Sequence, residues 1–512
     1  MASGRIDALV DWAHRHGARL HLDAEIYHDP QTGFSVRVPA TSPGLEAGSR
    51  VLSCPSSLGL SYLNALLDGP VAFPPRLPTV PPFPRDFMGG NPAQVIGRFF
   101  LMQQFLEGTN SFWWPYIRSL PQPEHISAWS GPPFWPDQDV EYLAGTNAHA
   151  SGVEIRANVR AEFKAARRQL KAAAHPGWRD YTPILYHWAY SIFTSRSFRP
   201  SLVLAEAAQH ALRPLLPAGV GLDDFSILQP VFDVANHSPA ARVVWEVGEH
   251  HCTLVTADPV APGAQVLNYY GPKTNAELLI AYGFLVPASE TLHNDYLHFR
   301  KRMVDRGHDP QQPSEAEQKR DKKPVEFLVS LRPMDHISSI SGRKRQFLRV
   351  GTAQPGLRLS RVFSHLEDAF ILDFALSLMT ETEQDILVEH SKLLKAKHDP
   401  DVVAPAGMEL QFWLLAALLA DPAEPRLVAV LVRITDAFDC KLRQDLDSLH
   451  EAAEGLELDV ARLNRNQKTA LEYRERVEAV LRAAMASLAE GRKGLQGGST
   501  PVNAEQSEHV AD

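Results

Sequence analysis

The sequence is poor in cysteine. Its 512 residues include only three, Cys54, Cys252 and Cys440, and these lie far apart. An odd, widely spaced set excludes a disulfide framework and a zinc site built from several cysteines. His250 and His251 beside Cys252 cannot converge on one ion from a strand, so we expect no bound metal. The composition indicates an intracellular protein of the cytoplasm, the nucleus or both.

The sequence also lacks blocks of basic charge and long apolar runs. It contains 51 Lys and Arg against 60 Asp and Glu, a formal net charge of −9, and the basic residues are spread along the chain. This pattern lacks the electrostatic footprint of a nucleic-acid-binding protein. No segment approaches ~18 uninterrupted apolar residues, and the N-terminus has no apolar core of the signal-peptide type. We expect neither nucleic acid nor a membrane as a partner, and the oligomeric state stays open.

Hydrophobic residues are abundant and follow two periods. They make up 44% of the chain, enough for two or three globular domains. Alternating runs predict strands, whereas apolar residues three or four positions apart predict helices. In chain order the patterns predict an N-terminal helix at 1–19, strands at 20–68, a helical block at about 86–215, strands at 226–287, a linker at 298–326, an all-α domain at 327–490 and a disordered tail at 491–512.

Local signals refine the β-type regions. FSVRV, SRVLSCP, VVWEV and HCTLVTA are predicted strands, as is QVLNYY at 265–270. The proline-rich stretch at 69–85 is predicted to be a connector or a covering arm. Thr274 followed by Glu277 forms a capping-box pattern, and Gly283 lies where such a helix would end. A short helix is therefore expected to close the second β-type region.

The candidate chemistry lies in FDVANHSPAARVVWEV, at 232–247. By itself, Asn236-His237 is typical of a turn asparagine followed by a partly buried histidine. Asp233, His237 and Ser238 are the residue types of a hydrolase triad. They lie within six positions of each other, however, and no G-x-S-x-G turn precedes them, which argues against that class.

Features around this pair change its interpretation. Asp233 precedes it in D-x-x-N-H-S, and Tyr270, in Tyr-Tyr-Gly, follows Asn236 by 34 residues. The capped segment NAELLIAYGF comes next, and the turn TGFSVRV lies near the N-terminus. Together these motifs resemble the SET-domain methyltransferases, specifically the branch typified by the Rubisco large-subunit lysine methyltransferase. The resemblance covers roughly residues 20 to 490.

The resemblance implies an α+β fold. Residues 20–297 would form a β-rich SET fold with a pseudoknot, interrupted by the helical insert, and an all-α substrate-binding domain would follow. It also implies the cofactor S-adenosylmethionine (SAM) and a protein substrate. The cysteine-rich, zinc-binding flanks of many histone-directed SET enzymes are missing, which indicates a non-histone protein substrate.

The resemblance further implies a role for each matching residue. Tyr270 would be the catalytic tyrosine. The residues implied to bind the cofactor are Thr32, Gly33, Phe34, Arg196, Asn236, His237, Tyr270 and Phe284. Those implied to bind the substrate side chain are Phe198, Asp233 and Tyr282. The turn QTGFSVRV departs from the family, because it retains one glycine of a G-x-G pattern.

These implications lead to a predicted function with alternatives. We expect a SAM-dependent protein-lysine N-methyltransferase that acts on a non-histone protein. A protein-histidine methyltransferase on the same fold and a SET-fold protein that only binds a partner are the alternatives. Tyr282 and Phe284 are equally compatible with aromatic core packing at a helix end.

Overall fold

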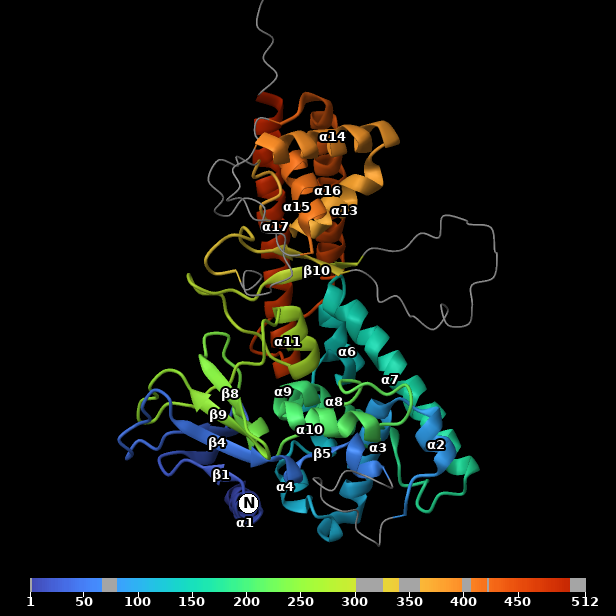
Figure 1. Ribbon diagram of the computed structural model, residues 1–512, viewed down its shortest axis with the longest axis vertical. Helices are drawn as coiled ribbons and strands as arrows, with labels where there is room; N and C mark the ends of the chain where they lie inside the picture. The colour runs from blue at the N-terminus through green and yellow to red at the C-terminus, as the bar shows by residue number, and fades with distance from the viewer. Residues whose placement is uncertain are drawn as a thin grey trace, which may run out of the picture. The chain divides into compact units, whose positions relative to one another are not determined.

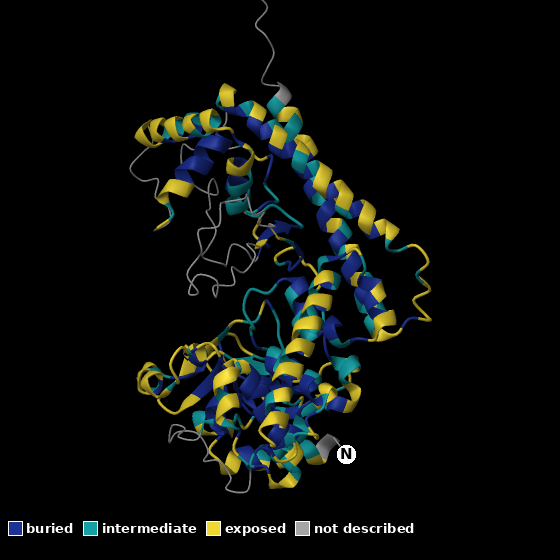
Figure 2. Cartoon of the chain, turned by 90° about the vertical axis from the view of Figure 1, so that its right-hand side faces the viewer, coloured by how far each residue is buried: buried dark blue, intermediate teal, exposed yellow. Residues whose placement is uncertain are grey.

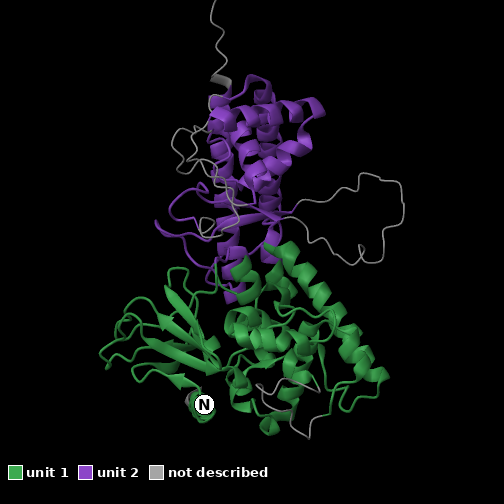
Figure 3. Ribbon diagram, in the orientation of Figure 1, with its two compact units in different colours: residues 1–140, 148–271, 277–284 green, residues 141–147, 272–276, 285–512 purple. Residues whose placement is uncertain are grey.

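The structure, a computed structural model, describes residues 2–66, 81–300, 326–339, 360–397, 407–420 and 423–497. The chain forms two compact units (Figure 3). Unit 1 comprises Met1–Val140, Ala148–Gly271 and Glu277–Phe284, and unit 2 comprises Glu141–Asn147, Pro272–Ala276 and Leu285–Asp512. Most of the predicted proline-rich connector, most of the predicted linker and the end of the tail lie outside the described residues.

Unit 1 begins with helix α1 (Ala2–Arg15) and contains three small sheets. The four-stranded antiparallel sheet has the order β1-β4-β9-β8 (Figure 1) and is built from Arg19–Leu20, Arg50–Pro55, His251–Thr256 and Val243–Val247. The hairpin pairs β2 (Glu25–Asp29) with β3 (Gly33–Arg37), and the third sheet has the order β5 (Leu60–Ser61), β7 (Ile227–Leu228) and β6 (Ser197–Phe198). The predicted strands before 68 and at 243–256 are thus confirmed.

The predicted strand at 265–270 is wrong. Its residues form only isolated bridges, Arg37 with Gln265 and His237 with Asn268. The Val266 amide donates to a β3 carbonyl at 2.9 Å, whereas the Asn268 amide donates to the Asn236 carbonyl at 2.7 Å. Because the segment changes partner after two residues, it cannot form one continuous ladder. It instead links the β2–β3 hairpin to the loop that contains Asn236.

The predicted helical insert of unit 1 is confirmed, from residue 85 to 212. Its helices are α2 (Arg85–Gly90), α3 (Ala93–Glu107), α4 (Trp114–Ser119), α5 (Ile126–Trp129), α6 (Asp137–Val140), α7 (Asn147–Ala172), α8 (Pro183–Arg196), α9 (Pro200–Val203) and α10 (Glu206–Leu212). Helix α8 starts where the Thr182 side chain accepts the Leu185 amide and Pro183 occupies the first turn. Trp113 and Trp188 are buried, and their indole N–H groups donate to backbone carbonyls at 2.9 and 2.7 Å.

In its described residues, unit 2 is mainly helical and contains one pair of strands. Strands β10 (Tyr296–Arg300) and β11 (Glu326–Ser330) pair antiparallel. The helices are α13 (Asp368–Leu378), α14 (Glu381–Lys397), α15 (Glu409–Leu419), α16 (Pro425–Glu451) and α17 (Arg465–Gly497). The apolar residues of α16 recur every three or four positions and are buried, as expected of an amphipathic helix. Figure 2 shows buried and exposed faces alternating along the long helices.

Three predicted boundaries need correction. The linker expected from 298 begins inside β10, and 327–330 of the predicted all-α domain belong to β11. The tail expected from 491 is helical through Gly497. A five-residue strand is too short to be read from periodicity when its partner lies beyond a long charged segment.

The short helix expected after Thr274 is confirmed as α11 (Asn275–Tyr282), and Gly283 follows it with φ +75°. None of the helices in the described ranges is both long and apolar enough to cross a membrane.

Candidate active site

The turn of the β2–β3 hairpin contains Thr32, Gly33 and Phe34. The Asp29 carboxylate accepts the backbone amides of Gln31 and Thr32 at 2.8 and 2.9 Å, and these hydrogen bonds lower the Asp29 pKa. Gly33 has φ +76°. A residue with a Cβ atom would be strained in this conformation. The retained glycine is therefore the one that the turn requires.

Asn236 lies against this hairpin although it is distant in sequence. Its side-chain amide donates to Ser35 Oγ at 2.7 Å and to Gln265 Oε1 at 3.2 Å. Gln265 in turn donates to the Tyr27 hydroxyl at 2.7 Å. Ser35 Oγ also lies 2.8 Å from Thr32 Oγ1. The hairpin turn and the Asn236 loop thus share one polar network.

An aromatic cluster continues from His237. Its Nδ1 accepts the backbone amide of Tyr270 at 3.1 Å, and the two rings stack with centroids 4.9 Å apart. The Tyr270 ring also stacks on the Tyr282 ring, with centroids 5.3 Å apart. The Phe284 ring meets the Tyr282 ring edge-on, with centroids 6.0 Å apart. Tyr270, Tyr282 and Phe284 therefore line one continuous aromatic surface with His237.

Both phenols of this cluster are protonated, and one of them donates a hydrogen bond. The Tyr270 hydroxyl donates to the Ala235 carbonyl at 2.9 Å. Burial raises the pKa of Tyr270 well above its usual value, and it raises the pKa of Tyr282 to about 12. Both hydroxyls stay protonated near neutral pH, so neither can act as a general base there.

Arg196 and Asp233 form a partly buried pair beside Tyr270. The Arg196 guanidinium donates to the Asp233 backbone carbonyl at 3.2 Å and lies 3.5 Å from Asp233 Oδ2. Tyr116 of α4 donates its hydroxyl to the same Oδ2 at 2.8 Å. Burial raises the pKa of Asp233, and Arg196 and Tyr116 oppose that shift. Val231, two residues before Asp233, has φ +70°, an uncommon conformation for a β-branched residue.

Sequence reasoning did not single out Tyr116. It lies in the stretch FWWPYIRSLP of the predicted helical block, whose aromatic residues suit a core. A hydroxyl on one ring of that run is the only local signal that it contacts a polar group. Its partner, Asp233, is 117 positions away, and no pattern in the sequence connects the two.

A second aromatic group surrounds Phe198. Its ring meets those of Phe232 and Trp245 edge-on, each at 5.2 Å, and Phe232 and Trp245 are 5.7 Å apart. The Trp245 indole donates to Asn268 Oδ1 at 2.9 Å. Phe198 and Asp233 thus lie in neighbouring parts of unit 1, whereas Tyr282 belongs to the cluster around Tyr270.

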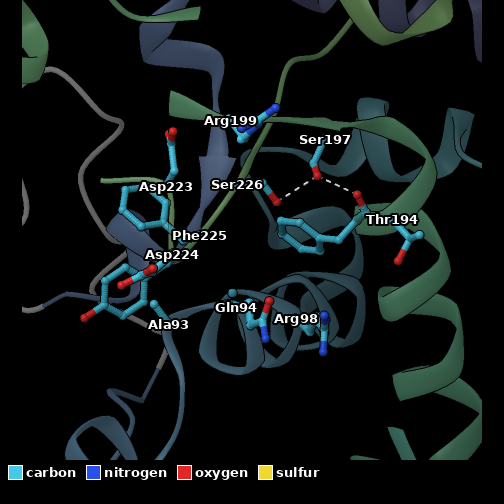
Figure 4. A pocket seen from close by; sticks show the side chains of 13 residues that line it. Ala93, Gln94, Arg98, Thr194, Ser197, Arg199, Asp223, Asp224, Phe225 and Ser226 are labelled. Carbon is cyan, nitrogen blue, oxygen red and sulfur yellow. Dashed lines mark hydrogen bonds between the residues drawn. The ribbon is translucent and has the colours of Figure 1, made fainter. Parts of the chain in front are cut away.

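The polar pocket in Figure 4 is separate from these groups. It has a volume of about 270 Å³ and is lined by residues that include Ser197 and Arg199, but by none of the predicted site residues. Ser197 Oγ donates to Ser226 Oγ at 2.7 Å at its wall. Successive strand side chains point to opposite faces, which explains why Ser197 lines the pocket and Phe198 does not.

Comparison with known proteins gives both distant sequence relatives and a shared fold. No family model matches the chain. The sequence is 26% identical over 288 residues to the ribosomal lysine N-methyltransferase set10 of Schizosaccharomyces pombe, 25% over 186 residues to the human N-lysine methyltransferase SETD6 and 23% over 287 residues to the human actin-histidine N-methyltransferase. These matches span 55%, 36% and 54% of this chain, but only 46%, 36% and 41% of the relatives.

Solved structures of Rubisco LSMT match nearly the whole chain. Its SET domain bound to MeLysine and AdoHcy superposes with a TM-score of 0.57 at 15% identity, covering 96% of this chain and 93% of that one. The structure of Rubisco LSMT bound to AdoMet gives 0.55 over the same shares. The fold is that of Rubisco LSMT. The SET resemblance and the α+β fold with a helical C-terminal region are therefore confirmed.

Within this SET fold, the structure brings most of the predicted residues together. The hairpin turn at 32–34 joins Asn236 through Ser35, and His237 joins Tyr270, Tyr282 and Phe284. Arg196 joins Asp233. Asp233 differs from the rest, because its side chain is only 1% exposed and its carboxylate is engaged by Tyr116 and Arg196.

Proposed function

We propose that the protein is a SAM-dependent protein-lysine N-methyltransferase that acts on a non-histone protein. One observation supports this most strongly: in a SET fold, the hairpin turn, Asn236-His237 and Tyr270 form one connected group of hydrogen bonds and ring contacts. The names of set10 and SETD6 specify lysine methylation, which agrees with the proposal.

The residues of the site fit SAM by their chemistry. SAM has a carboxylate, an ammonium group and an adenine ring, and when bound it supplies an electrophilic methyl group. Arg196 has a planar set of donors suited to a carboxylate, and among the described residues it contacts two oxygens of Asp233. The amide of Asn236 suits the amino-acid end, with the backbone at 32–34 beside it. The His237 backbone and the Phe284 ring suit the adenine.

The contribution of the chain to methyl transfer would be alignment. An in-line displacement needs its reacting atoms about 3 to 3.5 Å apart and collinear with the leaving group. The Tyr270 hydroxyl and the Ala235 carbonyl, which are joined by a hydrogen bond, would orient the target nitrogen. Neither phenol takes up a proton near neutral pH, so the proton of the target ammonium would leave to solvent.

The target amine must be neutral before it can react. A free lysine has a pKa of ~10.4. Burial beside Tyr282 and Phe284 would lower it, because a site with little water disfavours an ammonium. Aromatic walls also suit the apolar stem of a lysine side chain, with Phe198 contributing from the second group.

Histidine methylation is the second candidate. The human actin-histidine N-methyltransferase matches 54% of this chain, close to the 55% matched by set10. Mass spectrometry of a peptide methylated in cell extract with isotope-labelled SAM would separate the two. Label on lysine supports the proposal, and label only on histidine would overturn its substrate class.

The deciding test of the proposal is calorimetric titration with SAM. We expect micromolar binding by the wild type and loss of binding by Asn236→Ala, because Asn236 would contact the cofactor directly. Asn91→Ala is the matched control, since the Asn91 amide also donates to two oxygens, at 2.7 and 2.5 Å, but within the helical insert. Absence of binding by the wild type would favour a partner-binding SET protein without catalysis.

A further inference from the structure

We propose that Tyr116, in the helical insert, is a positioning residue for the cofactor site and acts through Asp233 on Arg196. The inference rests on the proposed function, because it takes Arg196 as the partner of the SAM carboxylate. It assigns a role to a residue outside the motifs that carry the SET resemblance.

Tyr116 is held in one place by its surroundings. It is 1% exposed and lies on α4, where its own backbone carbonyl accepts the Ser119 hydroxyl at 2.6 Å. The preceding Trp113 is anchored by its indole N–H, which donates to the Leu58 carbonyl at 2.9 Å. Burial raises the Tyr116 pKa well above its usual value, so its hydroxyl stays protonated. It is therefore a fixed donor to Asp233 Oδ2.

The Asp233 carboxylate depends on few partners for its charge. Oδ2 accepts Tyr116 and faces Arg196, while Oδ1 is buried and has no hydrogen-bond partner within the described residues. A buried carboxylate keeps its charge only when donors and cations compensate for the lost water. Removing the Tyr116 hydroxyl would take away one of the groups that favour the ionised carboxylate, leaving Arg196 and the Asp233 backbone amide, and would raise the Asp233 pKa further.

The charge of Asp233 in turn orients Arg196. The guanidinium is held at two points, by the Asp233 backbone carbonyl and by its carboxylate. An ionised Asp233 keeps the Arg196 fork in one orientation, and a protonated Asp233 removes the ionic contact. Since a bidentate contact with a carboxylate requires that orientation, the affinity for SAM would follow the ionised fraction of Asp233.

The other titratable groups around Asp233 stay neutral near neutral pH. Cys54 of β4 and Tyr270 both interact with Asp233, and burial raises the pKa of each well above its usual value. Tyr116 is likewise protonated, and Arg196 keeps its charge at all relevant pH values. His237 stacks on Tyr270 and is present in every variant below.

The first experiment measures SAM affinity of the wild type and Tyr116→Phe between pH 6 and 9. We expect the variant to bind SAM more weakly, by up to about tenfold at the acid end of this range if its Asp233 pKa is one unit higher, and the loss to shrink as pH rises. Taking the ratio of the two dissociation constants removes the titration of the SAM amino group. A ratio that is constant across pH would indicate a merely structural role and overturn the inference, and so would a ratio of one.

Tyr186→Phe is the matched control. Tyr186 is also a buried tyrosine of the insert, and its hydroxyl donates to a carboxylate, Glu162 Oε2, at 3.1 Å. The described contacts include none between Tyr186 and Asp233. We expect its affinity ratio to the wild type to show no pH dependence, so a trend like that of Tyr116→Phe would also overturn the inference.

A second measurement tests the Tyr116–Asp233 contact without SAM. Denaturant unfolding of both proteins at pH 5 and pH 8 gives the stability difference caused by the substitution. The pKa of Asp233 is higher in the folded protein than in the unfolded chain, and we expect it to be higher still in folded Tyr116→Phe. The free energy of unfolding therefore falls more steeply with rising pH in the variant than in the wild type. We expect the difference in unfolding free energy between the two proteins to be larger at pH 8 than at pH 5. An equal difference at both pH values would show that the Tyr116 hydroxyl does not favour the ionised form of Asp233 and would overturn the inference. Failure of the wild type to bind SAM at any pH would instead overturn the proposed function, together with the role of Arg196.

Discussion

The Tyr270 hydroxyl donates to the Ala235 carbonyl at 2.9 Å. This hydrogen bond joins the end of the 265–270 segment to the residue before Asn236, so the proposed catalytic phenol is fixed to the proposed cofactor loop. Its position is fixed again by the Tyr270 amide, which donates to His237 Nδ1 at 3.1 Å.

Tyr270→Phe is expected to separate binding from chemistry. The substitution keeps the ring stack on His237 but removes the hydroxyl, so SAM binding should persist. Methyl transfer should fall by about 100-fold, because misalignment of the reacting atoms alone costs that much. Single-turnover transfer from labelled SAM measures the chemical step. Tyr269→Phe is the control, and turnover like that of the wild type in Tyr270→Phe would contradict the catalytic assignment.

Gly33→Ala is expected to weaken SAM binding. Gly33 has φ +76° and no heavy atom within 4 Å of an added Cβ, so the substitution introduces backbone strain without a clash. The strain should cost about 1 kcal/mol of unfolding free energy or be relieved by a changed turn. Gly219→Ala has the same strain, with φ +84° and open space, and should leave SAM affinity unchanged. Equal SAM affinities of the two variants would show that the hairpin turn does not contact the cofactor.

Protonation of His293 should lower the free energy of unfolding in mild acid. It is fully buried, and its nitrogens lie about 3.0 Å from oxygens of Ser330 and Ser338. Burial, together with the charge of Arg332, lowers its pKa to about 4. Because the folded pKa is below the unfolded value, stability is complete above pH ~6.5 and is lost as pH falls towards 4, by about 2 to 3 kcal/mol.

Unfolding curves at pH 7 and pH 4.5 test this contribution. His293→Gln should flatten the pH dependence, because an amide does not titrate. His210→Gln, at a histidine whose side chain is 72% exposed, should leave the dependence as it is in the wild type. An unchanged slope in His293→Gln would refute the prediction.

Arg476→Met should destabilise unit 2 strongly. Arg476 lies 3.3 Å from Asp295, whose side chain is only 3% exposed. Losing the cation leaves a buried carboxylate supported mainly by the Asn275 amide at 2.6 Å, which should cost about 3 kcal/mol or more. Arg482→Met on the same helix breaks a pair with Glu478 in which the arginine is 58% exposed, and should cost at most about 1 kcal/mol. Denaturant midpoints compare the two, and equal losses would contradict the argument.

Local sequence was sufficient to predict most of the element order and to select residues that the structure brings together. Periodicity reports which face of a segment is buried, so the strands before 68, the helical insert and the helices after 368 could be predicted. The D-x-x-N-H-S and Tyr-Tyr-Gly motifs identified Asn236, His237 and Tyr270 because these residue types recur together in one family. None of this required knowledge of which segments meet.

The tertiary structure decided which segments and side chains contact each other. Gln265 to Tyr270 is as apolar as a strand, yet it divides its hydrogen bonds between β3 and the Asn236 loop. Strand β11 pairs with β10, and the pattern within 326–330 does not specify that partner. The contact of Tyr116 with Asp233 joins residues 117 positions apart. A periodic pattern encodes burial but not the identity of the neighbour, and the chemistry of a buried hydroxyl or carboxylate is set by that neighbour.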